Sequence, residues 1–489
     1  MVQNSQPGGS LSRATLFRRK PIPRGDLVEA DTGLKRSITT VQLASFGIGS
    51  TIGTGIFFVM SEAVPEAGPA VVVSFIIAGV AAGLAVICYA EMASAVPVSG
   101  STYSYAYSTL GEVVAMAVAA CLLLEYGVAT AAASVGWSQY VNALLDYIHL
   151  PTIPHILTAT PWDDDPGIVN LPAVILVAMC AVLLIRGASE SAKVNAIMVA
   201  TKIAVLIMFC AIAFTAFNDD NITPFFLDGA HGVTLAAGTI FFSFIGLDAV
   251  STAGEEVKDP QRTMPRALMI ALVTVIVVYV LVAIAAVGAQ QSDKFKGQEA
   301  GLAQILQDVT GSTWPALVLS AGAVISIFSV TLVTMYGQTR ILFAMGRDGM
   351  LPKFFMKVNT RTLTPVNNTI VVAVVVGLLA GFLPLNYLID MVSIGTLVAF
   401  TVVSLGVIIL RKREPDLKRP FKVPLFPLTP ILAIAACIYI MAGLHWYTYI
   451  FFLVWVLVIV GFYLVWGRKH SALNFTTDPL SGEFGHHTG

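Results

Sequence analysis

Residues 47–57 of this chain are Gly-Ile-Gly-Ser-Thr-Ile-Gly-Thr-Gly-Ile-Phe, a run with four glycines and three hydroxyl side chains. The run lies inside an apolar segment, residues 39–62, that is long enough to cross a bilayer as a helix. A continuous helix gains nothing from these glycines, because each interior glycine costs about 1 kcal/mol relative to alanine. Glycine does let the backbone unwind and present bare N–H groups, which a membrane tolerates where they line a protein-enclosed cavity. The run therefore predicts a helix that is broken near its middle.

A second interrupted segment occurs at residues 231–253, five predicted helices further along the chain. Residues 241–251 are Phe-Phe-Ser-Phe-Ile-Gly-Leu-Asp-Ala-Val-Ser, which again place a glycine and polar side chains inside an apolar run. Broken helices at matching positions of two five-helix halves are typical of transporters built from inverted repeats, with the binding site near the bilayer midplane. The alternative is that the glycines of residues 47–57 only allow neighbouring helices to pack closely.

Apolar segments recur along most of the chain. Of its 489 residues, 56% are hydrophobic and 12% are charged, against roughly 25% charged in an average soluble domain. This composition excludes a soluble fold and predicts an all-α polytopic membrane protein with 12 transmembrane helices. The predicted helices cover residues 39–62, 70–95, 112–147, 168–186, 191–217, 231–253, 265–289, 312–343, 366–384, 387–410, 424–445 and 447–467.

The cysteines and histidines do not form recognisable sites. All five cysteines lie inside apolar runs without paired spacing, so we expect neither a disulfide framework nor a metal site. The seven histidines lie at helix ends or in loops, and none has the spacing of a metal ligand set or a catalytic triad. We therefore do not expect an enzyme.

Basic residues gather on one side of the predicted helices. If the N-terminus is inside, 25 of the 28 Lys and Arg residues fall on the inner side, and only Lys294 and Lys296 fall on the outer side. The positive-inside rule then places both termini in the cytoplasm. The expected domains are a basic cytoplasmic tail (1–36), a transporter core of the first ten helices (37–410), the last two helices with the loop before them (411–467) and a cytoplasmic tail (468–489).

Shorter motifs accompany the two broken helices in a fixed order. Besides the two breaks, the motif residues are Tyr89, Glu91, Pro97, Ser99, Gly100, Ser101, Tyr103, Tyr105, Glu255, Glu256, Pro260, Arg347, Asp348 and Gly349. Together these motifs resemble the amino acid-polyamine-organocation superfamily, and within it the bacterial relatives of the cationic amino acid transporters, over nearly the whole chain. The resemblance implies a LeuT-type 5+5 inverted repeat with two extra C-terminal helices, opening alternately to either side. It also implies an amino acid substrate, which the residues alone do not.

An α-amino acid presents a carboxylate and an ammonium group, which need N–H donors and carbonyl acceptors. The half-helix after the first break has a positive N-terminal dipole that suits an anion, so Thr51, Thr54 and Gly55 are the expected carboxylate ligands. By the resemblance, three residues of the second broken helix would bind the ammonium group through carbonyls and close over the substrate. The alternative is that these side chains only pack in the core: Phe241, Phe242 and Ile245.

Lys202 is the one basic residue in the middle of the membrane. A charged amine there costs about 2.5–3.5 kcal/mol on insertion scales, so it indicates a function, and we expect proton coupling through it. By the resemblance, its ammonium group would replace the sodium ion that bridges the first and eighth helices of related transporters. The alternative is a lysine that snorkels to the cytoplasmic face.

Three more polar residues lie near the expected site. Glu125 lies in mid-helix, where its carboxylate would pair with the charged tail of a cationic substrate, unless it only hydrogen-bonds a neighbouring helix. Asp248 follows the second break and would relay a proton or pair with Lys202. Thr334 is short, which leaves room for an extended substrate.

Together these residues predict a secondary active transporter in a bacterial-type plasma membrane. We expect proton-coupled uptake of L-amino acids, with arginine, lysine or ornithine favoured. Protons are the expected coupling ion, without sodium or another cofactor, and the expected partners are the substrate and the bilayer but no nucleic acid. The alternatives are an amino acid/amine antiporter, a proton symporter for small neutral amino acids such as alanine, and an amino acid-binding membrane sensor. The sequence leaves any accessory subunit open.

Overall fold

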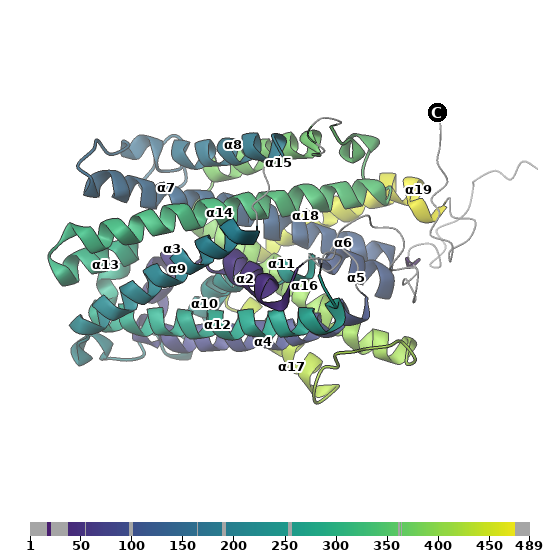
Figure 1. Cartoon of the computed structure of the whole chain (residues 1–489), viewed down its shortest axis with the longest axis horizontal. Helices are drawn as coiled ribbons and strands as arrows, with labels where there is room; N and C mark the ends of the chain where they lie inside the picture. Colours follow the sequence, from purple (N-terminus) through teal and green to yellow (C-terminus); the bar gives the residue numbers. More distant parts are fainter. Residues whose placement is uncertain are drawn as a thin grey trace, which may run out of the picture.

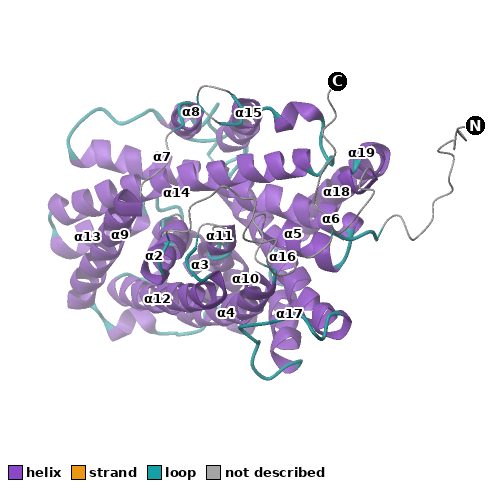
Figure 2. Ribbon diagram, turned by 45° about the vertical axis from the view of Figure 1, so that its right-hand side comes forward, coloured by secondary structure: helices purple, strands orange, loops and turns teal. Residues whose placement is uncertain are grey.

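The computed structural model describes residues 17–20, 38–53, 55–96, 101–163, 165–187, 192–252, 257–359, 362 and 364–474. Within these ranges the chain forms helices and connections without a strand (Figure 2), and a single β-type bridge joins Ile38 to Val257. Thr54 and five of the motif residues lie outside the described residues: Pro97, Ser99, Gly100, Glu255 and Glu256.

A helix lies in each of the twelve predicted ranges, and three ranges hold two helices: the two with predicted breaks, and residues 112–147. Figure 1 shows the longer helices running side by side along the long axis of the molecule. In chain order they are α2 (Thr40–Thr51) with α3 (Gly55–Ala67), α4 (Val71–Ala95), α6 (Glu112–Leu123) with α7 (Ala129–Tyr147), α8 (Leu171–Ile185), α9 (Ala192–Ala213), α10 (Gly229–Phe241) with α11 (Ala249–Thr252), α12 (Pro260–Ala289), α14 (Thr313–Arg347), α15 (Val366–Phe382), α16 (Leu385–Arg413), α17 (Leu428–Met441) and α18 (Trp446–Phe462).

Three further helices were not predicted: α5 (Ser101–Thr109), α13 (Gly301–Thr310) and the three-residue α19 (Arg468–His470). Each is too short to span a bilayer, which needs about 20 residues. In α13 the buried side chains Leu302, Ile305 and Leu306 recur at helical spacing, so one face packs on the bundle while the other stays polar. Such mixed faces escape a search for long apolar runs.

Length and composition identify membrane spans within the described residues. Seven helical segments are long and apolar enough to cross a bilayer, among them Glu112–Tyr147 and Thr313–Arg347. Four shorter apolar helices accompany them: Leu171–Ile185, Gly229–Phe244, Val366–Phe382 and Leu428–Met441.

The two broken helices lie in the interior of the bundle. Figure 2 shows α2, α3, α10 and α11 in the middle of the molecule, with α4, α12, α14 and α16 around them. Close approach explains part of the glycine content, because a Cβ at Gly47 would lie 2.6 Å from a methyl group of Val250. Packing and unwinding therefore both use the glycines of residues 47–57.

Candidate functional site

The predicted break in the first helix is confirmed. Helix α2 ends at Thr51, and Ile52 leaves the helical conformation with a ψ of 98°. Helix α3 begins at Gly55, so the N-terminal end of a second half-helix lies at the break. The first N–H groups of a helix have no partner within it, and its dipole favours negative charge there. Thr54, one of the expected carboxylate ligands, falls between the described residues.

The predicted break in the second broken helix is confirmed too. Helix α10 ends at Phe241 and continues as a single 3₁₀ turn, after which Ile245 is extended with a ψ of 145°. Gly246 has a φ of +100°, a conformation that favours glycine. A Cβ at Gly246 would also lie 2.6 Å from the Ser50 carbonyl oxygen, so only glycine fits this position.

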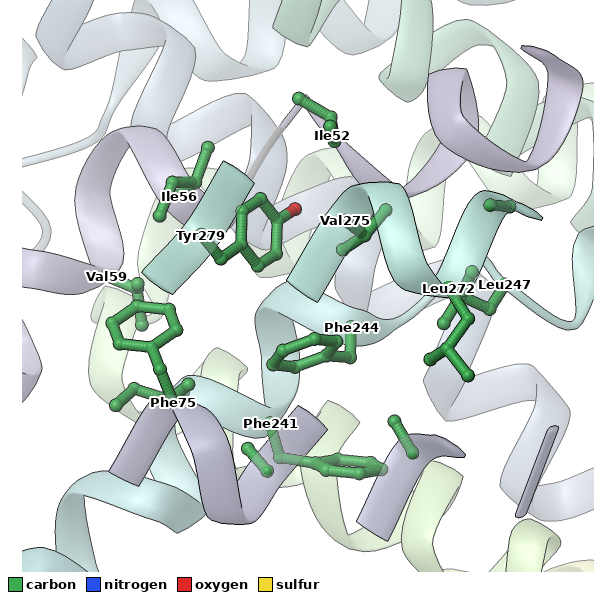
Figure 3. Packing of buried hydrophobic residues seen from close by; sticks show 14 of the residues in the cluster. Ile52, Ile56, Val59, Phe75, Phe241, Phe244, Leu247, Leu272, Val275 and Tyr279 are labelled. Carbon is green, nitrogen blue, oxygen red and sulfur yellow. The ribbon is translucent and has the colours of Figure 1, made fainter. Parts of the chain in front are cut away.

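The two breaks are tied to each other. Ser50 Oγ donates a hydrogen bond of 2.8 Å to the Gly246 carbonyl. The Tyr279 hydroxyl of α12 lies 2.9 Å from the Thr51 carbonyl and 3.0 Å from the Ser243 carbonyl, so it serves both unwound segments. Figure 3 shows Tyr279 between Ile56 and Phe244.

Sequence reasoning missed Tyr279. A signal was present, because it is the one hydroxyl in the apolar run Val275–Val282.

Apolar side chains gather on one side of the second break. The rings of Phe242 and Phe58 have centroids 5.7 Å apart. Both belong to a buried cluster with Leu124 and Val128, which lie between α6 and α7, and with residues of α7, α8, α14, α15 and α16; Ile245 packs against it. Of the three expected ammonium-binding residues, Phe242 and Ile245 thus lie together.

Phe241 lies apart from them. Its side chain is fully buried with its ring 5.9 Å from that of Phe400 on α16, in the packing layer of Figure 3. The Phe241 side chain thus belongs to the core, whereas its backbone forms part of the last turn of α10.

Thr334 links two neighbouring helices. Its hydroxyl accepts a hydrogen bond of 2.9 Å from Thr130 on α7 and donates one of 2.9 Å to the Val330 carbonyl of its own helix α14. Thr51 likewise donates its hydroxyl to a carbonyl of its own helix, that of Gly47, at 2.8 Å. Both hydroxyls therefore stabilise local structure in this state.

Lys202 is buried between three helices. Its Nζ donates a hydrogen bond of 2.8 Å to the Gly49 carbonyl, one turn before the first break. A Cβ at Gly53 would lie 3.2 Å from that Nζ and 3.4 Å from the Ser326 carbonyl of α14. The ammonium group thus lies between α2, α9 and α14, and the side chain, 2% exposed, does not snorkel to the surface.

Glu125 contacts another acid. It lies in a π turn, Leu124–Val128, between α6 and α7, and its carboxyl is within hydrogen-bonding reach of the Asp248 carboxyl. Asp248 also accepts a hydrogen bond of 3.0 Å from the Tyr126 hydroxyl. Thr396 of α16 lies against Glu125, but its hydroxyl donates to the Val392 carbonyl at 3.1 Å.

Within the described part of the chain, neither oxygen of Glu125 receives a hydrogen bond from a donor group. Ionised carboxylates only accept, so two of them make a favourable contact only when one carries a proton. The site therefore contains a carboxyl pair suited to hold one proton.

The π turn that carries Glu125 was not predicted. Turns of this kind are frequent at functional sites, where the extra residue changes the direction of the side chains. Here Gly127 faces Gln338 of α14, since a Cβ at Gly127 would lie 3.3 Å from the Gln338 amide nitrogen. Hydropathy carries no signal for a π turn, because an extra residue in a helix leaves an apolar run unchanged.

Comparison with known proteins identifies the family. The family model described as amino acid permease matches residues 38–467, which is most of the chain. The chain belongs to the amino acid permease family. This permease is thus a member of the amino acid-polyamine-organocation superfamily, and its apolar helices are those of a multi-pass membrane protein.

The relatives of the permease are transporters rather than enzymes. It is 41% identical over 469 residues to the branched-chain amino acid permease BcaP of Bacillus subtilis, covering 94% of this chain and 100% of the relative. It is 40% identical over 463 residues to the methylthioribose transporter of the same organism, with the same coverage. The vacuolar cationic amino acid transporter 4 of Arabidopsis thaliana is 34% identical over 413 residues, covering 82% of this chain and 68% of the relative.

Proposed function

We propose that this permease couples the uptake of amino acids with apolar side chains to an inward flow of protons across a bacterial plasma membrane. The contact between the buried carboxyls of Glu125 and Asp248 carries the proposal. Such a pair holds a proton in one state and repels itself without it. If loss of the proton separates α6–α7 from α10–α11, proton release and substrate release occur in the same movement.

The proposal includes the architecture expected from the sequence. Helices α2 to α16 form a LeuT-type 5+5 inverted repeat of ten spans, α17 and α18 lie outside it, and both termini are cytoplasmic. In support, helix breaks occur in the first helix of each half, at α2/α3 and α10/α11. Glu91, Glu112 and Asp348 share one end of the bundle with their Lys and Arg partners, as the positive-inside rule requires for a cytoplasmic face.

The two breaks suit the charged groups of an α-amino acid. The N-terminal end of α3 would bind the carboxylate through Thr51, Thr54 and Gly55. Unwound carbonyls of the second broken helix would bind the ammonium group, with Phe242 closing over the substrate. Supporting residues for this half of the site are Phe241, Phe242 and Ile245, whose backbone ends α10 and leaves the helical conformation.

The surroundings favour an apolar substrate side chain. Phe58, Phe242, Ile245 and Val128 gather beside the break, and BcaP, named as a branched-chain amino acid permease, is 41% identical. The preference for arginine or lysine expected from the sequence depended on Glu125 meeting the substrate tail, and here that carboxyl meets Asp248. Thr334 and the plant cationic amino acid transporters keep the cationic substrates as the second candidate.

Lys202 has a supporting part in this proposal. Its ammonium group donates to the Gly49 carbonyl beside the first break, where a cation would otherwise be needed to neutralise the exposed carbonyls. We propose that it makes sodium unnecessary. We also propose that its bond to α2 changes when α6–α7 separates from α10–α11. Transport should then depend on protons and not on sodium.

Reconstitution in liposomes tests the proposal. Labelled leucine, arginine and alanine are offered with and without an inward proton gradient, in the presence and absence of sodium, with unlabelled methylthioribose as a competitor. The variants are Glu125→Gln and Lys202→Met, and Asp259→Asn is the control because its side chain lies at the surface in an ion pair with Arg262. Proton-driven leucine uptake that Glu125→Gln abolishes supports the proposal.

Other outcomes overturn defined parts of it. Uptake only into vesicles preloaded with substrate identifies an antiporter, and selective uptake of arginine returns the substrate to the cationic class. Substrate binding without uptake under any condition identifies a sensor. Inhibition of leucine uptake by methylthioribose at lower concentrations than unlabelled leucine would identify a thio-sugar carrier.

A further inference from the structure

A histidine and a buried acid meet at the end of the bundle opposite Glu91. His445 lies between α17 and α18, and its Nδ1 is 2.7 Å from Asp390 Oδ2 in the first turns of α16. Thr448 donates a hydrogen bond of 3.1 Å to the same oxygen. The imidazole is 43% exposed, whereas the Asp390 side chain is 4% exposed. The His445 imidazole is thus accessible to water, whereas the Asp390 carboxyl that it contacts is buried.

Other titratable groups surround this pair. Glu66 at the end of α3 interacts with both His445 and Asp390, and within the described residues its buried Oε2 has no hydrogen-bond partner. The ring of Tyr447 stacks on His445 at 5.2 Å, and its hydroxyl reaches Asp390. The hydrogen bond to Asp390 raises the pKa of His445, because it favours the protonated imidazole. The imidazole is therefore suited to take protons from water.

Polar residues continue from Asp390 along α16. Ser393 and Thr396 follow at intervals of three residues, which makes each the neighbour of the last on the helix surface. All three side chains are buried, and Ser393 Oγ has no hydrogen-bond partner in the described part of the chain. The row covers about 9 Å along the helix axis. It ends at Thr396, which lies against Glu125.

Helix α16 lies close to the helix that carries Glu125. A Cβ at Gly395 would be 3.1 Å from the Cys121 carbonyl of α6 and 3.3 Å from Leu124 Cβ. A larger residue at 395 would separate Thr396 from the π turn. Gly395 thus lets Thr396, the last residue of the polar row, lie close to the Glu125–Asp248 pair.

We propose that the row His445, Asp390, Ser393 and Thr396 delivers protons from the outer face to the Glu125–Asp248 pair. This inference rests on the proposed proton coupling and on the orientation that places His445 outside. His445 takes a proton from external water and passes one to Asp390. From there each hydroxyl, with water between the turns, accepts one proton as it gives up its own. Glu125 receives the last proton, so the pair loses one negative charge and the row returns to its starting state.

The competing explanation is structural. The bond between His445 and Asp390 could serve only to fasten the α17–α18 connection to α16. A fastening role predicts loss of every transport mode when the bond is broken. A relay role predicts loss of net proton-driven uptake alone, because exchange of substrate for substrate needs no new proton from outside.

The test compares two transport modes in the same proteoliposomes. Proton-driven leucine uptake and leucine counterflow are measured for Asp390→Asn, His445→Gln and Ser393→Ala. Ser404→Ala is the matched control, because Ser404 is a buried serine of the same helix whose hydroxyl donates to the Phe400 carbonyl at 2.9 Å. We expect Asp390→Asn and Ser393→Ala to lower proton-driven uptake about tenfold or more, as for loss of a positioned proton donor, with counterflow unchanged.

The outcomes separate the relay from the proposed function. If the wild type shows no proton-driven uptake, the proposed function fails. If the wild type is proton-driven and Glu125→Gln abolishes the drive, while Asp390→Asn and Ser393→Ala behave like Ser404→Ala, the coupling stands and the relay is wrong. If counterflow falls as much as proton-driven uptake, the row is a structural fastening and the relay is again wrong.

Discussion

Buried acids at one end of the bundle have cations as partners, whereas those in the middle have each other. At the end that carries Glu91, Glu112 and Asp348, here called the inner end, each carboxylate contacts Arg or Lys. In the middle, Glu125 contacts Asp248. Both regions contain Asp and Glu side chains. At the inner end they form ion pairs, whereas in the middle the two carboxyls contact each other.

Glu91 is the clearest case at the inner end. It receives Arg411 Nε at 2.7 Å and the Val423 N–H at 2.6 Å, and Arg419 lies 3.7 Å away. The bonds join the end of α4 to the end of α16 and to the loop before α17. Two arginines and a backbone N–H surround this carboxylate, so the contact is structural.

The segment before the first helix uses the same principle. Arg18 lies 3.0 Å from Glu112, and Lys20 lies 3.0 Å from Asp348, which the Tyr103 hydroxyl also contacts at 3.1 Å. Arg18 also contacts Asn474, near the other end of the described chain. Two carboxyls that contact each other gain such stability only while they share a proton. Ion pairs therefore join chain segments at the inner end, whereas the contact in the middle depends on a proton.

The largest effect is expected for Glu91→Gln. The change leaves two arginines without their carboxylate, and breaking a buried ion pair from one side costs about 3–5 kcal/mol. The free energy of unfolding, measured by titration with sodium dodecyl sulfate in mixed micelles, should fall by that amount. The control is Asp259→Asn, which removes an exposed carboxylate 4.0 Å from Arg262 and should change stability by less than about 0.5 kcal/mol. Equal losses of unfolding free energy in both variants would show that the buried ion pair of Glu91 contributes no more than the exposed one of Asp259.

The Lys20–Asp348 pair should show a smaller coupling. Lys20 is 34% exposed, so solvent screens the pair, and a double-mutant cycle with Lys20→Met and Asp348→Asn should give about 1 kcal/mol. The cycle uses the same unfolding titration. A coupling near zero would mean that residues 17–20 are held by their backbone bonds to Tyr107 and Glu112 and by the side-chain contacts of Arg18.

Glu125→Gln makes the same chemical change as Glu91→Gln and should leave stability nearly unaltered. The amide of glutamine can donate a hydrogen bond to Asp248 without needing a proton, so the expected change in the free energy of unfolding is within about 1 kcal/mol. Uptake should lose its dependence on external pH. A destabilisation as large as that of Glu91→Gln would show that the carboxyl pair is a structural contact.

The sequence predicted the two helix breaks and the burial of Lys202, for a physical reason. Glycines and hydroxyls in an apolar run are costly in any continuous helix, so the run from Gly47 to Phe57 had few explanations. Lys202 also had few explanations, because a lysine amine inside a bilayer needs hydrogen-bond acceptors. In the structure it donates to the Gly49 carbonyl.

Partners of the acids could not be predicted. Glu125 and Asp248 are 123 residues apart in sequence, and their contact depends on a π turn that leaves hydropathy unchanged. The same limit applies to His445 and Asp390, which two different helices bring together at 2.7 Å. Single-residue chemistry is visible in a sequence, whereas a contact between distant residues depends on the packing of whole helices.

The smallest expected effect concerns His445, a third kind of pairing that joins an acid to a cation which itself titrates. Because Asp390 raises the pKa of His445 in the folded protein, the pair stabilises the fold fully below the unfolded-state pKa of about 6.5. That stability is lost as pH rises through the raised pKa.

The melting temperature of the wild type should therefore exceed that of His445→Gln most at low pH, and the difference should shrink as pH rises. The imidazole is 43% exposed, and solvent screening limits the effect to about 0.3 kcal/mol. Thermal unfolding of both proteins in detergent, from well below to well above a pH of about 6.5, measures this difference in melting temperature. A difference that grows with pH would mean that the neutral imidazole is the form that Asp390 and Glu66 stabilise, and His445 would then be unable to take up protons from water.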